Sequence, residues 1–138
     1  MMNCSPLILD VCNALMSNIS GVKVMPEFPD EMQDLPLREP MISVGVNAIK
    51  VESGIEDVNN VSNNNSPVIL TMRMSICVPK TMTGMRCNQL VDATITAMSD
   101  ILPKYTIIGI KAGSISYSAT LSALNVNVDV IFKLGNAF

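Results

Sequence analysis

The first part of the chain carries apolar residues at helical spacing. Ser5 suits a helix cap and Pro6 suits the first helical position. Gly21 follows at a position where a left-handed residue can end a helix. The apolar positions between them recur every three or four residues: Leu7, Ile8, Val11, Cys12, Leu15, Met16 and Ile19. We therefore expect a helix up to about Ile19 that lies on an apolar layer, followed by a short extended segment over residues 22–25.

Alternation with a period of two predicts strands farther along the chain. Residues 41–51, 68–78 and 120–134 alternate apolar and polar side chains, as strands with two different faces do. Residues 105–117 form a less regular strand because Gly109 and Gly113 interrupt it, and Ser118-Ala119 suits the turn of a hairpin. A second helix is expected from residues 81–83 to Leu102. Its predicted apolar stripe comprises Leu90, Val91, Thr94, Ile95, Met98, Ile101 and Leu102.

Two polar connections separate these elements. Residues 26–40 contain four prolines with acids between them, so they cannot form a central strand or a long helix. Residues 52–66 are acidic and then asparagine-rich, which is typical of a long loop between strands. We expect both segments to make contacts outside the core of the subunit.

The order of these elements predicts a single α+β domain over residues 1–138. Long strands that follow each other without an intervening helix favour an antiparallel sheet, here of four to five strands, with both helices packed on one face. Long, lightly charged strands leave edges that can pair with another chain. Arg73 and Lys133 are candidates for charges that protect such an edge.

The composition favours a protein that works by assembly. Charged residues make up only 15% of the chain, so part of its surface is expected to be covered by other polypeptides. The alternative, that Ser, Thr and Asn supply the surface polarity, stays open. The net charge is −3, and no basic run interleaved with aromatic residues occurs, which argues against nucleic-acid binding. No apolar stretch is long enough to span a bilayer, and residues 1–5 lack the features of a signal peptide, so we expect synthesis in the cytoplasm.

Little in the sequence suggests catalysis. The chain has no histidine, which excludes Ser-His-Asp and Cys-His sites, and it has no Ser-Lys or glycine-rich phosphate-binding motif. Carboxylates cluster at Asp30, Glu31 and Asp34 and again in residues 52–57, but without the spacing of an EF-hand. We interpret them as solvated acids, and a metal-dependent enzyme stays as the less favoured alternative. We therefore expect no enzymatic activity and no cofactor.

Sulfur-containing residues are more informative about packing than about chemistry. The four cysteines, Cys4, Cys12, Cys77 and Cys87, include no C-x-x-C pair, so buried thiols are favoured over a zinc site. Eleven methionines are many for this length. Met72, Met74 and Met98 are expected in the core, whereas Met82 and Met85, near a helix start, are expected to be exposed contact residues.

The sequence resembles a known family in the order and length of its elements. A helix with S-P-L-I-L-D-V-C-N-A-L leads through a proline-rich acidic connection to M-I-S-V-G-V. Then follow P-V-I-L-T-M-R-M-S-I-C-V-P, a helix with N-Q-L-V-D-A-T-I-T-A-M, and a closing V-N-V-D-V-I-F. This pattern is similar to the tail-terminator and tail-completion proteins of tailed bacteriophages and related contractile particles. The resemblance covers nearly the whole chain.

The resemblance implies a non-enzymatic protein that forms a hexameric ring. Such a ring caps the tail tube and contacts tube, sheath or neck proteins in a virion or phage-like particle assembled in the bacterial cytoplasm. The candidate assembly contacts are Glu52, Glu56, Asp57, Arg73, Met82, Met85, Asp30 and Glu31. The alternative is an adaptor, a chaperone or a head-completion binding module for another particle protein.

Overall fold

The computed structural model describes residues 5–26, 39–51, 68–82, 84–102, 104–119 and 122–134. It confirms the predicted α+β class, with two α-helices and a six-stranded sheet. The predicted loop over residues 52–66, and nearly all of the proline-rich connection, lie outside the described residues.

The elements follow the predicted order. They are α1 (Ser5–Asn18), β1 (Lys23–Pro26), β2 (Met41–Val51), β3 (Val68–Pro79), α2 (Gly84–Ala97), the 3₁₀-helix η3 (Met98–Ile101), β4 (Thr106–Ala112), β5 (Ser116–Ser118) and β6 (Ala123–Leu134). Gly21 has a φ of +73°, the left-handed conformation expected of a glycine just after a helix. The irregular strand is divided at Gly113, whose N–H still donates to the carbonyl of Asn127 at 2.8 Å.

The strand order in the sheet is β1-β2-β3-β6-β4, and β5 also pairs with β6. The β2–β3, β3–β6 and β6–β4 pairs are antiparallel, as predicted. The β1–β2 pair is parallel, which makes the sheet mixed. Parallel neighbours require the chain to return to the starting end of the first strand. Residues 27–40 are the segment that connects these two strands.

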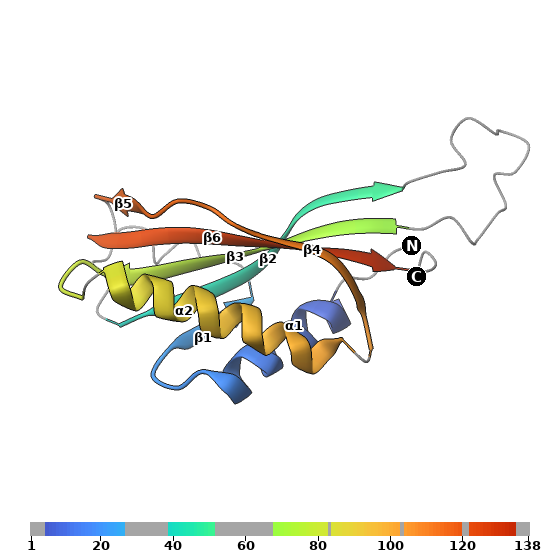
Figure 1. Cartoon of the computed structure of the whole chain (residues 1–138), viewed down its shortest axis with the longest axis horizontal. Coiled ribbons are helices and arrows are strands. Elements are labelled where there is room, and N and C mark those ends of the chain that lie inside the picture. Colours follow the sequence, from blue (N-terminus) through green and yellow to red (C-terminus); the bar gives the residue numbers. More distant parts are fainter. Residues whose placement is uncertain are drawn as a thin grey trace, which may run out of the picture.

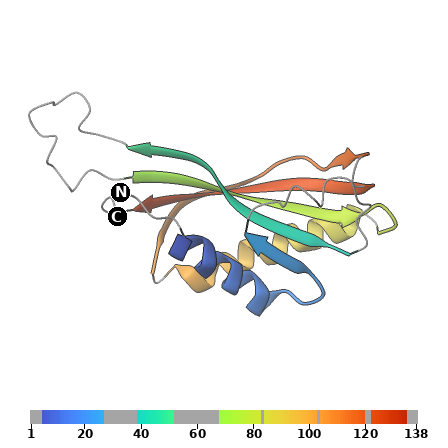
Figure 2. The same ribbon diagram turned by 180° about the vertical axis from the view of Figure 1, so that it is seen from behind.

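Both helices lie on one face of the sheet, as Figure 1 and the reverse view in Figure 2 show. The side chains that β3 and β6 direct toward the helices form the core. They include Leu70, Met72, Met74, Val128, Val130 and Phe132, all fully buried. Met72, Met74 and Met98 are therefore core residues, as predicted.

The second helix buries a narrower stripe than the sequence predicted. Ile95 and Leu102, both assigned to the stripe, are exposed, whereas Cys87 and Ala97 are buried. For Leu102 the reason is a change of helix type after Ala97. A 3₁₀-helix has three residues per turn, so Met98 and Ile101 share one face and Leu102 is turned away from the core.

Thr94 provides a stability prediction, because its hydroxyl is fully buried and makes no hydrogen bond within the described residues. A buried, unpaired hydroxyl destabilises a protein by about 1–3 kcal/mol. Valine has nearly the same shape and a similar helix propensity. We therefore expect Thr94→Val to raise the free energy of unfolding by about 1 kcal/mol in urea titration. Thr96→Val, at an exposed position of the same helix, is the control and should change it little.

Candidate assembly surfaces

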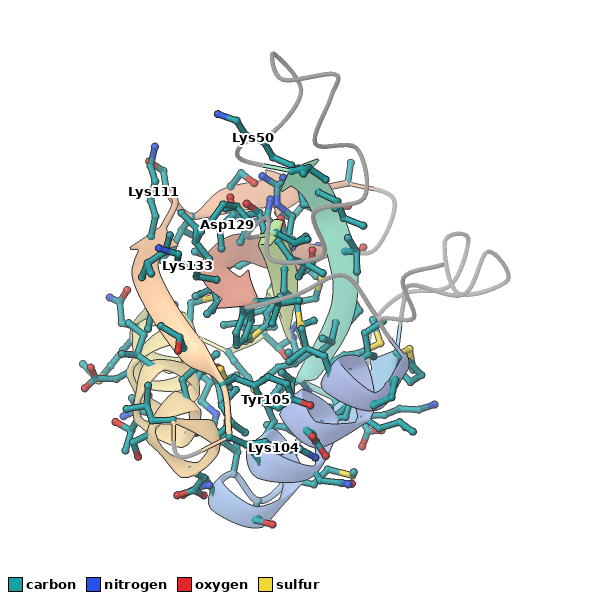
Figure 3. All side chains as sticks on the ribbon, turned by 90° about the vertical axis from the view of Figure 1, so that its right-hand side faces the viewer. Lys50, Lys104, Tyr105, Lys111, Asp129 and Lys133 are labelled. Carbon is teal, nitrogen blue, oxygen red and sulfur yellow. The ribbon has the colours of Figure 1, made fainter. Side chains whose placement is uncertain are left out.

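The sheet has two free edges in the part of the chain that the structure describes. β4 forms one of them. The second half of β2 forms the other, because β1 pairs only with residues 41–44 and leaves residues 45–51 without a neighbour on that side. Figure 3 looks along the strands from the end of the sheet at which β2 finishes, and it shows β4 and β2 at opposite margins of the sheet. Outward-facing N–H and C=O groups on such edges can bind a further strand.

Large apolar side chains are exposed along both free edges. Val46, Ile49 and Val51 lie on β2, and Ile108 and Ile110 lie on β4. Ile49 is 49% exposed and Ile108 is 54% exposed. Neither free segment contains proline, which would prevent strand addition. These edges therefore combine unpaired backbone with apolar surface, which is what another chain could cover.

A second apolar area surrounds the start of α2. Met82 and Met85 are exposed, as the sequence predicted, and Met85 is 68% exposed. Ile115 and Tyr117, on and beside β5, are exposed as well. A Cβ placed on Gly84 would lie 3.9 Å from Cδ1 of Ile115, so the helix start and this edge of the sheet are adjacent. Whether Met82 and Met85 contact a partner stays a prediction.

The sheet face opposite the helices is polar and internally paired. Arg73 donates two hydrogen bonds to the carboxylate of Asp129, at 2.8 and 3.1 Å. Ser75 donates to Asn127 at 2.9 Å. The prediction that Arg73 and Lys133 protect an edge is wrong, because β3 and β6 are interior strands. Arg73 instead stabilises a cross-strand pair, and its role as an assembly contact stays a prediction.

Three lysines add positive charge to this same face. Register places Lys50 opposite Ile69, Lys133 opposite Ile69 from the other side, and Lys111 opposite Asp129. Figure 3 shows Lys50 and Lys111 extending away from the helices, at the two margins of the sheet. Lys50 and Lys111 are exposed near the ends of the two free edges, where they discourage unspecific strand pairing, whereas Lys133 lies on the interior strand β6.

A polar clamp joins α1 to the start of β4. The hydroxyl of Tyr105 and the ammonium of Lys104 donate to the same oxygen of Asp10, at 2.7 and 3.0 Å. Both residues lie beside α1 in Figure 3. Asn18 donates to Asp100 across the same gap. A shallow hollow of about 280 Å³ lies here. Its main polar groups bind one another, so we interpret it as a structural junction between helices.

The clamp predicts a dependence of stability on pH. The hydrogen bond from Tyr105 and then that from Lys104 hold the pKa of Asp10 below its usual value of 3.8. A carboxyl whose pKa is lowered by folding stabilises the fold above its unfolded pKa, and this contribution is lost as the pH falls through the folded pKa. We expect Asp10→Asn to reduce stability at pH 7 and to lose less stability than the native chain between pH 5 and pH 2.

Urea unfolding at a series of pH values measures this effect. Asp92→Asn, which replaces an exposed carboxylate on α2, is the matched control and should behave as the native chain does. An identical loss of stability with acid in Asp10→Asn and the native chain would contradict the prediction.

The described cysteines are buried thiols, as predicted. Cys12, Cys77 and Cys87 are free and buried, and burial raises the pKa of each thiol. In the described ranges no group of three potential ligands is placed to hold a metal ion. No helix there is long and apolar enough to cross a membrane. Cys4 lies outside the described residues, as do the candidate contacts Asp30, Glu31, Glu52, Glu56 and Asp57.

Comparison with known proteins gives structural likenesses but no match by sequence. No known family's sequence profile matches the chain, and no curated protein matches it by sequence. A structural neighbour is the sheath/tube terminator of PVC, an extracellular contractile injection system, in its extended state. The match covers 99% of this chain and 58% of that one, with 12% identity and a TM-score of 0.41. This chain thus spans little more than half of the neighbour's length, and no family membership follows.

Proposed function

We propose that this chain is a structural assembly protein that forms a ring, caps the tail tube of a phage-like particle and joins the tube to sheath or neck proteins. The main support for the proposal is that β2 and β4 have edges that no described residue pairs with, and that apolar side chains are exposed along them. A chain that worked alone would be expected to cover or charge such edges. The element order on which the tail-terminator resemblance rests is present along the described chain.

The energetics favour association through these surfaces. Burying apolar surface contributes about 25 cal/mol per Å². An edge strand that adds to a neighbour's sheet also gains backbone hydrogen bonds without rearranging either core. Association can therefore leave the fold of the subunit unchanged, which suits a protein that adds to the end of a preformed tube.

Other candidate surfaces would face the partners above and below the ring. Met82 and Met85 form an adaptable apolar surface at the start of α2, and Arg73 lies on the polar sheet face. The acidic residues Asp30, Glu31, Glu52, Glu56 and Asp57 are proposed as further contacts from sequence alone. The proposal includes no nucleic acid, membrane, cofactor or catalytic step.

Light scattering, negative-stain imaging and a tube-growth assay test this function. We expect the purified chain, alone or with tube protein, to form closed rings, and added chain to shorten polymerising tubes. Exclusively monomeric chain in the presence of tube protein, together with unchanged tube length, would overturn the proposal. An adaptor or chaperone would instead form a small stable species with one captured partner and would leave preformed tubes unaltered.

A further inference from the structure

The two free edges occupy the same level of the sheet. Strand register can be followed straight across β2, β3, β6 and β4. One such row contains Gly45, Arg73, Asp129 and Lys111, and another contains Lys50, Ile69, Lys133 and Thr106. The free part of β2 and the free strand β4 thus overlap over the rows of residues 69–73 of β3, on opposite sides of the sheet.

The two edges also match in length. Each strand has a bulge between these rows, at residues 46–48 in β2 and at residues 107–109 in β4. Each therefore uses six residues, 45–50 and 106–111, where β3 and β6 use five, 69–73 and 129–133. Because the bulges fall on both edges, a β2 edge and a β4 edge can pair residue for residue over this length.

The directions of β2 and β4 also allow these two edges to pair between copies. β2 and β4 run in opposite directions within one subunit, since three antiparallel pairings separate them. A second copy placed beside the first at the same level, with its helices on the same side, therefore brings β4 antiparallel to β2. This arrangement joins two different surfaces, so its repetition produces a ring where the rotation between copies closes.

The side chains are compatible when residues 45–50 of one copy lie opposite residues 106–111 of the next. Lys50 would face Thr106 of the next copy, and Lys111 would face Gly45, so the two lysines lie about five residues, roughly 16 Å, apart. On the helix side, Val46 would face Ile110 and Ile49 would face Ile107. Three exposed apolar residues, Val46, Ile49 and Ile110, would then be covered, and no like charges would lie directly opposite each other.

We propose that copies of this chain associate head to tail, with residues 45–50 of β2 pairing antiparallel with residues 106–111 of β4 in the next copy, which continues the sheet around a ring. This inference rests on the self-association included in the proposed function and names its interface and register. The occupant of both edges is a second copy of the chain itself.

Disulfide cross-linking tests the register. All variants carry Cys4→Ser, and the three described native cysteines are buried. Lys50→Cys and Thr106→Cys chains are mixed and oxidised, and covalent dimer is measured on non-reducing gels. Within one chain these positions are three strand spacings apart, roughly 14 Å, so no internal disulfide can form. We expect at least ten times more dimer in the mixture than in either variant alone.

Two further samples distinguish register and symmetry. The matched out-of-register mixture, Lys50→Cys with Lys111→Cys, should give no more dimer than the single variants. One chain carrying both Lys50→Cys and Thr106→Cys should give a ladder of covalent oligomers. Abundant dimer from Lys50→Cys alone would overturn the inference in favour of a two-fold contact between β2 edges.

Light scattering of the native chain separates the two proposals. If the native chain forms rings but the Lys50→Cys and Thr106→Cys mixture gives no excess dimer, the interface is wrong and the proposed function stands. If native chain stays monomeric with and without tube protein, the proposed function fails and this inference fails with it.

Discussion

Replacing Ile49 with aspartate is expected to weaken self-association about a hundredfold. Ile49 lies on the free part of β2, where half of its side chain is exposed, so the charge can be accommodated in the isolated subunit. When the edges are paired, the aspartate at this position would contact apolar side chains of the next copy. Burying an unpaired carboxylate there would cost about 3 kcal/mol, which corresponds to roughly two orders of magnitude in affinity.

Sedimentation velocity over a dilution series measures this change. Met16→Asp is the matched control, because Met16 is 53% exposed and lies on α1, outside the sheet. The control should assemble as the native chain does, and thermal unfolding should confirm that both variants are folded. Equal effects of the two substitutions, or unchanged assembly of Ile49→Asp, would show that the β2 edge takes no part in association.

Replacing Phe132 with alanine is expected to lower the free energy of unfolding by about 3–5 kcal/mol. Phe132 is fully buried and lies opposite Leu70 on β3 and Ile107 on β4. Its ring also meets that of Tyr105 edge to face, with centroids 6.1 Å apart and planes at 79°. The substitution therefore removes apolar burial, an aromatic contact and the packing between two strands.

Urea unfolding of the native chain and two variants measures this effect. Ile131→Ala is the control, because the neighbouring Ile131 lies on the opposite, partly exposed face of the same strand. It should cost about 1 kcal/mol. If Phe132→Ala does not fold, Phe132→Leu keeps most of the apolar volume and should still lose more stability than Ile131→Ala. Equal losses on the two faces would contradict the assignment of the core.

Most of the fold could be predicted because the spacing of apolar residues within each element indicates its type and its buried face. Alternation in β3 and β6 identified which side chains face the helices, and the structure buries those same residues. Gly21 identified the end of α1. Their position near a helix start also identified Met82 and Met85 as exposed. These features depend on neighbours within one element, so one sequence is enough to reveal them.

Other features depend on contacts between distant segments. The sequence could not show that Arg73 would meet Asp129, because β3 and β6 are separated by an α-helix, a 3₁₀-helix and two strands. The turn of α2 into a 3₁₀-helix exposed Leu102, and apolarity alone had placed it in the core. Asp10, Lys104 and Tyr105 form a clamp that no motif indicates.

The amino-acid sequence by itself determined the strands, the helices, the buried side of β3 and β6 and the lack of histidine-based chemistry. The tertiary structure alone decided which strands are edges, and hence which exposed apolar residues are available to a partner. The physical reason is that side-chain periodicity is encoded within each strand, whereas strand order results from long-range packing. Among the described residues, 45–51 form a free edge because β1 stops pairing at Val44.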